Sequence, residues 1–231
     1  MNPRSDAESA PEPVRIDVEG TTRVSGLMQH PRGARACMVL GPGAGAGMAH
    51  PFMAGIAAEL AARGVATLRY QFPYMERGGK RPDAPVLCHA TVRAAVLAAR
   101  ELAPTLALIA GGKSFGGRMT SQAQADSPLP GVLGLAFLGF PLHAPKRPSS
   151  DRGEHLLQVR IPLLFLQGTR DELADLTLIR RLVERLGKLA TLRVLADADH
   201  SFHVLVRSGR TDAQVRTEML DSVMSWIAAV I

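Results

Sequence analysis

A serine lies between closely spaced glycines near the middle of the 231-residue chain, in the segment Gly112-Lys113-Ser114-Phe115-Gly116. An apolar run at 106–109 precedes this segment, and alternating polar and apolar residues follow it. That order is typical of a strand, a sharp turn and a helix that together expose a nucleophilic serine. A side chain at Gly112 or Gly116 would collide with neighbouring backbone at such a turn. The spacing therefore predicts that Ser114 is a nucleophile.

The same residues admit a second interpretation, because Gly112-Lys113-Ser114 also resembles the end of a phosphate-binding loop. That motif needs another glycine five residues before Gly112, where this chain has Ala107 inside the expected strand. No long loop of backbone amides then remains to surround a phosphate chain. Because Gly-x-Ser-x-Gly also occurs by chance, the nucleophile interpretation depends on finding an acid and a histidine downstream.

Candidate partners for the serine follow two later apolar runs. Asp171 follows the run at 163–166, and His200 follows the run at 191–195. Functional residues of a parallel sheet gather in the loops at the carboxyl ends of its strands. A serine hydroxyl needs an imidazole to take its proton, and the imidazole needs a carboxylate to orient it and balance its charge. We therefore predict that Ser114, Asp171 and His200 form a catalytic triad.

Other acids and histidines in these two loops have alternative interpretations. Asp175 is better placed as the N-cap of a following helix, and Glu172 lies in the same turn with a longer side chain. Asp197 and Asp199 lie on the histidine's own loop, where we interpret them as turn formers or supporting groups. We expect His203 to pack or to form a hydrogen bond near the site.

An oxyanion formed by attack on a carbonyl needs backbone N–H donors. The residue after the nucleophile, Phe115, supplies one, and the loop after the apolar run at 37–40 supplies the other from Ala44 or Gly45. The glycine-rich loop at 41–47 also loosely fits a dinucleotide fingerprint. The following strand ends without the Asp or Glu that would bind a ribose, so the oxyanion interpretation is favoured.

The elements that must position these residues alternate along the chain. Strands are expected at 14–18, 21–28, 37–40, 65–70, 106–109, 132–138, 163–166 and 191–195, and helices at 52–63, 91–102, 175–186 and 212–231. This alternation predicts an α/β fold with helices on both faces of a mostly parallel sheet and an antiparallel hairpin at its N-terminal edge. We expect residues 1–12 to be a disordered leader and residues 13–231 to be a single domain.

Composition restricts the class of protein. The chain is 46% apolar with a net charge of +6, but only 4% of its residues are aromatic and its basic residues are scattered, which disfavours nucleic acid as a partner. No apolar stretch approaches the roughly 20 residues of a membrane span. The two cysteines, Cys37 and Cys88, form neither a disulfide framework nor a metal-binding spacing. We expect a cytoplasmic protein without a metal or cofactor.

Basic residues near the predicted nucleophile bear on the substrate. Lys113 and Arg118 flank Ser114, and Arg69 ends a neighbouring strand. Lys113, Arg118 and Arg69 favour a substrate with a carboxylate or phosphate group. We interpret most other basic residues as solvated surface groups.

Several motifs together resemble one family. They are Gly43-Ala44-Gly45, Met48-x-His50-Pro51-Phe52-Met53, Arg69-Tyr70-x-Phe72-Pro73-Tyr74, the Ser114 segment through Met119, Phe137-Leu138-Gly139-Phe140-Pro141-Leu142-His143, and Asp197-Ala198-Asp199-His200-Ser201-Phe202. From about residue 20 the chain resembles a bacterial branch of the α/β-hydrolases. This branch is similar to the hydrolase-like domain of a subunit of a eukaryotic histone acetyltransferase complex, and more distantly to dienelactone hydrolases. Pro42 departs from the histidine that many relatives have there, which we expect to alter loop rigidity more than chemistry.

The resemblance implies a three-layer α/β-hydrolase fold and says very little about the substrate. From the predicted triad we expect a serine hydrolase that acts on a small acyl ester or thioester through an acyl-enzyme. The connection at 140–160 is too short for a large cap domain, so we expect an open site. The alternative is a catalytically silent hydrolase fold that serves as a protein-interaction module. The presence of all three predicted triad residues favours the enzyme.

Overall fold

The computed structural model of this chain describes residues 10–18 and 22–231, and its centre is one eight-stranded sheet. The strands are β1 (Glu12–Asp17), β2 (Arg23–Gln29), β3 (Ala36–Gly41), β4 (Val65–Tyr70), β5 (Ala107–Lys113), β6 (Val132–Leu138), β7 (Leu163–Gly168) and β8 (Ala190–Leu195). Their order across the sheet is β1-β2-β4-β3-β5-β6-β7-β8. Strands β3 to β8 are parallel, whereas β1 and β2 form an antiparallel hairpin that joins β4. The expected α/β sheet with an N-terminal hairpin is therefore confirmed.

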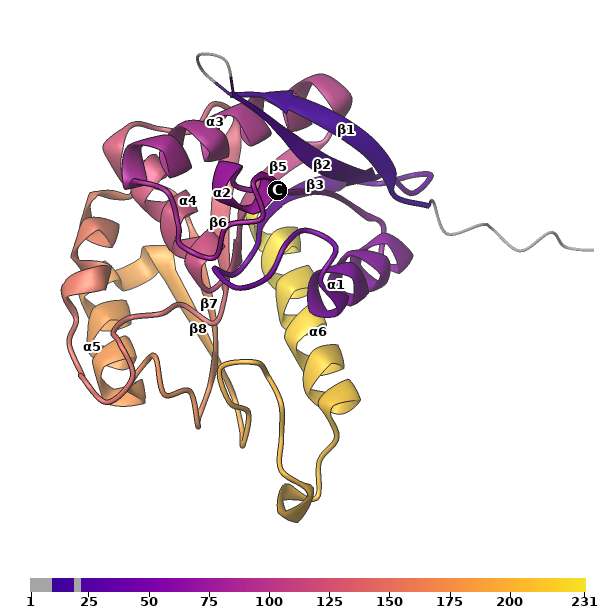
Figure 1. The fold of residues 1–231 in the computed structure, drawn as a ribbon. Helices are drawn as coiled ribbons and strands as arrows, with labels where there is room; N and C mark the ends of the chain where they lie inside the picture. The colour runs from indigo at the N-terminus through magenta and orange to yellow at the C-terminus, as the bar shows by residue number, and fades with distance from the viewer. Residues whose placement is uncertain (1–9, 19–21) are drawn as a thin grey trace, which may run out of the picture.

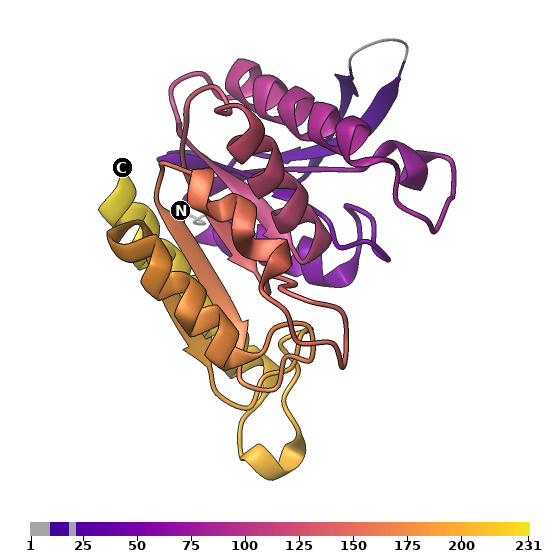
Figure 2. The ribbon, with the colours of Figure 1, turned by 90° about the vertical axis from the view of Figure 1, so that its left-hand side faces the viewer.

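Helices cover both faces of the sheet (Figure 1). Helices α3 (Pro85–Leu102), α4 (Phe115–Asp126) and α5 (Leu176–Leu186) pack on one face, together with the 3₁₀ segment at 151–158, as Figure 2 shows. Helices α1 (Pro51–Ala62) and α6 (Asp212–Val230) pack on the other. The sheet is thus the middle of three layers, and its central strands are buried on both sides.

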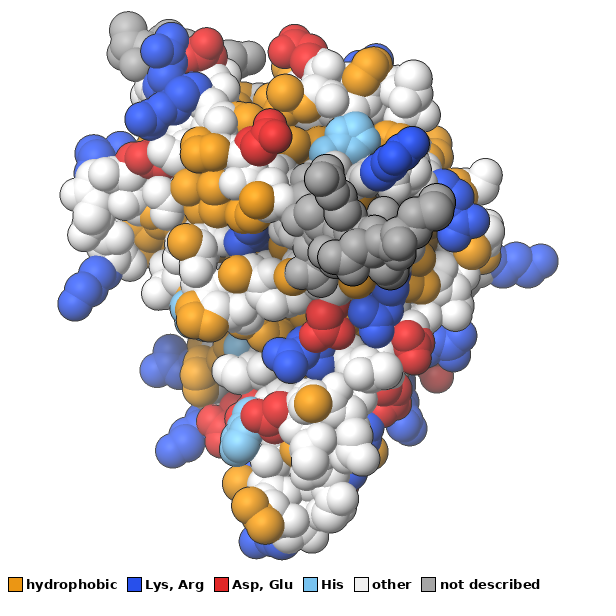
Figure 3. Space-filling model, turned by 90° about the vertical axis from the view of Figure 1, so that its right-hand side faces the viewer, with side chains coloured by type: hydrophobic (Ala, Val, Ile, Leu, Met, Phe, Trp, Pro, Cys, Tyr) orange, Lys and Arg blue, Asp and Glu red, His pale blue; other side chains and the backbone are white. Residues whose placement is uncertain are grey.

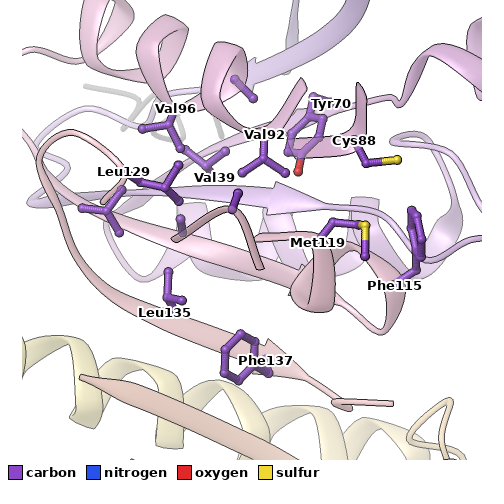
Figure 4. Close-up of a cluster of buried hydrophobic side chains, with 14 of the residues drawn as sticks. Val39, Tyr70, Cys88, Val92, Val96, Phe115, Met119, Leu129, Leu135 and Phe137 are labelled. Atoms are coloured by element: carbon purple, nitrogen blue, oxygen red, sulfur yellow. The ribbon is translucent and has the colours of Figure 1, made fainter. Parts of the chain in front are cut away.

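Each face has its own apolar core. The larger core joins the sheet to α3, α4 and α5, and Figure 4 shows part of it, from Val39 and Val92 to Phe115 and Phe137. The smaller core joins the opposite side of the strands to α1 and α6. Strands β3, β4 and β7 are buried at every residue. A strand buried on both faces tends to be a continuous apolar run, which made most of β3 and β7 identifiable from the sequence. Strand β4 departs from this pattern, because it also buries Thr67 and Arg69.

The structure differs from expectation in the segment between β4 and β5. The sequence predicts a loop at 73–85 and a helix from Thr91, but a short helix, α2 (Pro73–Glu76), occupies the loop and α3 begins at Pro85. Proline is favoured in the first helical turn because it has no N–H to leave unpaired. The proline that reads as a loop residue therefore starts the helix, six residues before the predicted position.

The N-terminal boundary also differs from expectation. Strand β1 begins at Glu12, inside the predicted leader, while residues 1–9 and the expected hairpin residues Gly20 and Thr21 lie outside the described part of the chain.

The connection from β6 to β7 contains only the 3₁₀ segment at 151–158. It forms no cap domain, as the short connection predicts. No described helix is long and apolar enough to cross a membrane.

The surface on the side of α1 mixes charges of both signs. Figure 3 shows Lys and Arg side chains scattered among Asp and Glu on this face, rather than gathered into one patch. Within the described residues that this view shows, no broad basic surface is present. Although the chain has a net charge of +6, its basic side chains on this face are dispersed among acidic ones.

Backbone-to-backbone contacts hold the centre of the sheet to the start of α4. A Cβ atom placed on Gly116 would lie 2.2 Å from the carbonyl oxygen of Gly41, and one on Gly112 would lie 2.2 Å from the same oxygen. Real Cβ atoms do not approach backbone oxygens this closely. The end of β3 is thus pressed against the turn between β5 and α4, and only glycine fits at these positions.

We expect Gly116→Ala to lower the free energy of unfolding by about 3 kcal/mol, because the added methyl group must push two backbone segments apart. Gly55→Ala is the matched control. Gly55 lies within α1, where the nearest atom to an added Cβ is the Arg216 Nη1 at 3.8 Å, so alanine should be neutral or stabilising by about 0.5–1 kcal/mol. Urea denaturation of both variants measures the difference, and equal stabilities would contradict the steric argument.

Candidate active site

The candidate nucleophile lies at the turn between β5 and α4. Ser114 has φ 49° and ψ −111°, a backbone conformation that non-glycine residues rarely adopt. Such strain costs of the order of 1–3 kcal/mol and persists only where the surrounding structure enforces it. Here the strand before Ser114 and the helix after it enforce the turn, which directs the serine side chain toward the carboxyl end of the sheet.

The three residues predicted to form a triad are joined by hydrogen bonds. The Oγ of Ser114 lies 2.8 Å from the Nε2 of His200, and the Nδ1 of His200 lies 2.7 Å from the Oδ2 of Asp171. With Nδ1–H donating to the carboxylate, Nε2 is left as the acceptor for the serine hydroxyl. Residues from three strand-end loops, separated by up to 86 positions in sequence, are thus brought together in the predicted order.

The carboxylate of Asp171 is buried and receives three hydrogen bonds. Its side chain is 0% exposed, whereas that of His200 is 22% exposed. Besides His200, the Nε2 of Gln167 donates at 2.5 Å and the backbone N–H of Leu173 at 2.8 Å. The Oε1 of Gln167 accepts from the N–H of Phe140 at 3.0 Å, which leaves its amino group facing the carboxylate. Asp171 therefore has one fixed orientation, with one oxygen available to the imidazole.

Neighbouring acids have the structural roles that the sequence analysis considered for them. Asp175 is the N-cap of α5 and accepts from the N–H groups of Thr177 and Leu178, which confirms the capping interpretation. Asp199 accepts from the N–H groups of Ser201 and His203 and so closes the turn that carries His200. These acids support the two loops while Asp171 contacts the imidazole.

The amides predicted to bind an oxyanion belong to two segments that meet beside Ser114. Within the described residues, the N–H groups of Phe115, Ala44 and Gly45 donate to no protein acceptor. The carbonyl oxygen of Ala44 accepts a hydrogen bond from the hydroxyl of Tyr74 at 2.7 Å, which fixes the glycine-rich loop at this residue. Open donors on a fixed loop next to a serine are what oxyanion binding requires.

Arg69 does not line the site, contrary to the sequence expectation. It is 2% exposed, and its Nη1 donates to the carbonyl oxygen of Met48 at 3.0 Å. The reason is its place on β4, an interior strand paired with β2 and β3, where its side chain contacts Met48 directly after the glycine-rich loop at 41–47. Arg69 therefore supports that loop and is withdrawn as a substrate-binding residue.

The two basic residues that flank Ser114 lie in different surroundings. The Nζ of Lys113 donates to the carbonyl oxygen of His200 at 2.7 Å. Arg118 lies one turn into α4, with its guanidinium 5.9 Å from the ring centroid of Phe115 and its Nε buried without an acceptor among the described residues. Burial, and then the charge of Arg152, lower the pKa of Arg118.

A cavity of about 350 Å³ opens beside Ser114 and His200. Its walls include Ala46, Phe52, Met53 and Leu173. Among the described residues that line the cavity, Lys113 is the one Lys or Arg. Phe52 stacks on Phe202 with ring centroids 5.9 Å apart, which fixes one wall. A cavity of this size and character suits a small, mostly apolar group.

Comparison with known proteins identifies the fold. Residues 34–228 match the family described as alpha/beta hydrolase domain. This chain belongs to the α/β-hydrolase family. A solved α/β serine hydrolase without a lid from Xanthomonas campestris is similar at 22% identity over 97% of this chain and 98% of its own, with a TM-score of 0.72. An α/β serine hydrolase homologue from Coxiella burnetii (19% identity, 91% and 96% coverage, TM-score 0.73) and a dienelactone hydrolase from Anabaena variabilis (21%, 91% and 96%, 0.70) share the fold.

Sequence reasoning assigned no role to several residues that shape this α/β-hydrolase site. Tyr74 and Gln167 each make one polar contact that fixes a functional loop or side chain. Phe52 and Leu173 line the cavity. Gln167 follows the apolar residues at 163–166 within β7, and a polar residue near a strand's carboxyl end is a signal that could have found it. Nothing in the local sequence links Tyr74 to Ala44, because the contact spans 30 residues.

A partly buried histidine, His155, whose Nε2 lies 2.7 Å from the Oγ of Ser121, makes stability depend on pH. Burial, and then the charge of Arg118, lower the pKa of His155 from 6.5 to about 4. Because the unfolded chain binds this proton more readily, stability is fully present above pH 6.5 and is lost as pH falls toward 4. We expect His155→Gln to weaken this loss, whereas replacement of the exposed His30 by Gln should not. Urea denaturation at pH 7 and pH 5 measures how much the free energy of unfolding of each variant changes with pH. Equal changes in the two variants would contradict the assignment.

Proposed function

We propose that this chain is a serine hydrolase that cleaves a small acyl ester or thioester through an acyl-enzyme. Ser114 is the nucleophile, His200 the general base and acid, and Asp171 the carboxylate that orients the imidazole. The observation that carries the proposal is the continuous hydrogen-bonded chain from the Asp171 carboxylate through His200 to the Ser114 Oγ at a strained turn beside a cavity.

The proposed reaction follows from this arrangement. As the Ser114 Oγ attacks the acyl carbon, its proton passes to the Nε2 of His200, and the carbonyl oxygen takes the negative charge. The N–H groups of Phe115 and of Ala44 or Gly45 are the donors for that charge. Collapse of the intermediate breaks the bond to the leaving alkoxide or thiolate, which receives the proton from Nε2. Water then repeats the sequence on the acyl-enzyme, so that an acid is released and Ser114 regains its proton.

The shape of the site supports a small substrate. The cavity beside Ser114 is about 350 Å³, with walls that include Phe52, Met53 and Leu173. No cap domain covers the described site, which agrees with hydrolysis of compact, accessible esters. A short acyl or leaving group fits these walls better than a long chain does, because a chain that extends beyond the cavity gains little further apolar burial.

The first prediction of this proposal concerns the nucleophile. We expect a fluorophosphonate probe to label the wild-type protein and not Ser114→Ala. We also expect Ser114→Ala to lower the rate of hydrolysis of p-nitrophenyl acetate and butyrate by at least about 10³-fold. Mass spectrometry of the labelled peptide locates the modified residue. Labelling that persists in Ser114→Ala would remove this serine from the mechanism.

A second prediction tests whether Asp171 or the neighbouring Asp175 is the carboxylate that orients the imidazole of His200. Asp171→Asn should lower kcat about 10²–10⁴-fold, because the amide no longer holds the imidazole in the required tautomer. Asp175→Asn is the matched control, since asparagine also caps a helix and Asp175 makes its contacts to backbone N–H groups of α5. If Asp175→Asn lost as much activity as Asp171→Asn, the assignment of the carboxylate would be wrong.

We also propose that the substrate carries a carboxylate or phosphate group that reaches beyond the cavity to Arg118, which is not among the residues that line the cavity. The guanidinium of Arg118 lies over Phe115, the residue after the nucleophile, and a second guanidinium, that of Arg152, is near enough to lower its pKa. Within the described residues, neither arginine forms an ion pair with an acid. An anion between them would relieve their repulsion.

The test compares a neutral ester with a carboxylated one of similar length, such as p-nitrophenyl butyrate and p-nitrophenyl hemisuccinate. Arg118→Gln should lower kcat/KM about tenfold for the hemisuccinate and less than about twofold for the butyrate. Arg100→Gln, at an exposed arginine near the end of α3, is the control. Equal effects on both esters, or none on either, would overturn the anionic preference while leaving the hydrolase proposal intact.

The alternative of a catalytically silent interaction module receives no comparable support. Such a module has no chemical requirement for a serine, an imidazole and a carboxylate held within 2.8 Å and 2.7 Å of one another. The open amides of Phe115 and Ala44 likewise have no evident function in an inert fold. The hydrolase proposal accounts for both features.

A further inference from the structure

Lys113, the residue before the candidate nucleophile, extends from the end of β5 to the loop that carries His200. Its Nζ donates to the carbonyl oxygen of His200 at 2.7 Å and lies 5.4 Å from the ring centroid of Phe202. A Cβ atom placed on Gly139 would lie 3.2 Å from this Nζ and 3.4 Å from the imidazole of His200. The ammonium group is therefore packed directly against the histidine loop.

Lys113 is partly buried at the wall of the cavity. Among the described residues, no carboxylate lies within 4.0 Å of its ammonium group. Burial lowers the pKa of Lys113 from 10.5 to about 8, although Asp171 and Asp199 act in the opposite direction. Because the unfolded chain holds this proton more tightly, the charge destabilises the folded protein near neutral pH. A residue chosen for stability alone would be apolar at this position.

The loop that carries His200 is held to neighbouring segments at several points. The backbone N–H of Arg170 donates to the carbonyl oxygen of Ala198 at 2.9 Å, and the carboxylate of Asp212 accepts from the N–H of Val204 at 2.9 Å. Within the described residues, the bond from Lys113 is the one hydrogen bond that reaches the backbone of His200 itself. Its imidazole is held by Asp171 and its backbone by Lys113, so the ring is fixed from two ends.

We propose that Lys113 is a positioning residue, whose side chain holds the backbone of His200 so that the imidazole stays within reach of both Ser114 and Asp171. This inference rests on the proposed hydrolase function. It assigns Lys113 a role in the geometry of the base, in place of the attraction for an anionic substrate that the sequence suggests. The hydrogen bond to His200 is charge-assisted, and such bonds are about twice as strong as neutral ones.

The inference carries a pH dependence. The charged or titratable groups that face Lys113 are Asp171 from the loop after β7, and Asp199 and His200 from the loop after β8. From the loops after β6 and β3, Gly139 and Gly43 bring only backbone. As the ammonium loses its proton, the hydrogen bond to the His200 carbonyl weakens. The value of kcat should therefore decline above about pH 8 in the wild-type protein.

The test replaces Lys113 with methionine, which has similar length, no charge and no donor. Lys113→Met should lower kcat about 10–100-fold, leave KM within about threefold for both neutral and carboxylated esters, and abolish the decline above pH 8. Its thermal midpoint should equal or exceed that of the wild type, because a buried charge has been removed. Lys188→Met, at an exposed lysine before β8, is the control and should change neither kcat nor the pH profile.

Three results would overturn the inference. They are a kcat for Lys113→Met within about twofold of wild type, a loss confined to carboxylated esters, and a lowered thermal midpoint with an unchanged pH profile. If Lys113→Met did not fold, a wild-type kcat with no decline near pH 8 would overturn it as well. A wild-type protein that is neither labelled at Ser114 nor active on any ester would instead refute the hydrolase proposal itself.

Discussion

The close approach of two backbone segments is the constraint on which the rest of the site depends. A Cβ atom on either Gly112 or Gly116 would lie only 2.2 Å from the carbonyl oxygen of Gly41 at the end of β3. This contact lets β5 turn into α4 with Ser114 in a strained conformation, φ 49°. The same contact brings the glycine-rich loop after β3 beside the serine. The proposed nucleophile and the amides proposed to bind the oxyanion are therefore positioned by the same packing of two backbone segments.

Buried polar contacts hold the three functional loops to this centre. Tyr74 fixes the glycine-rich loop at Ala44, Gln167 orients Asp171, and Lys113 reaches the backbone of His200. Each bond satisfies a polar group inside a poorly hydrated region, where an unpaired group would cost about 1–3 kcal/mol. Further hydrogen bonds join the loops after β7 and β8 to each other, such as that from the Arg170 N–H to the Ala198 carbonyl oxygen.

Charge was the feature that sequence pattern described least well. Lys113, Arg118 and Arg69 are all basic residues near a strand end, and the sequence treats them alike. The structure separates them, because Arg69 supports the glycine-rich loop, Lys113 contacts the His200 backbone, and Arg118 lies over Phe115. A side chain's charge is visible in the sequence, but its partner depends on which segments the fold brings alongside it.

The sequence by itself determined the α/β sheet, most of its strands and the order of the candidate site residues. Strands buried on both faces read as apolar runs, glycine spacing marked the sharp turn, and the loops that follow successive strands had to meet at one edge of the sheet. The start of α3 at Pro85 was missed although proline in a first helical turn is a local signal. The sequence did not determine the cavity walls formed by Phe52 and Leu173 or the partner of Arg69. Those two features depend on contacts between residues distant in the chain. Only tertiary structure decides such contacts, because no local pattern encodes which buried donor meets which carbonyl.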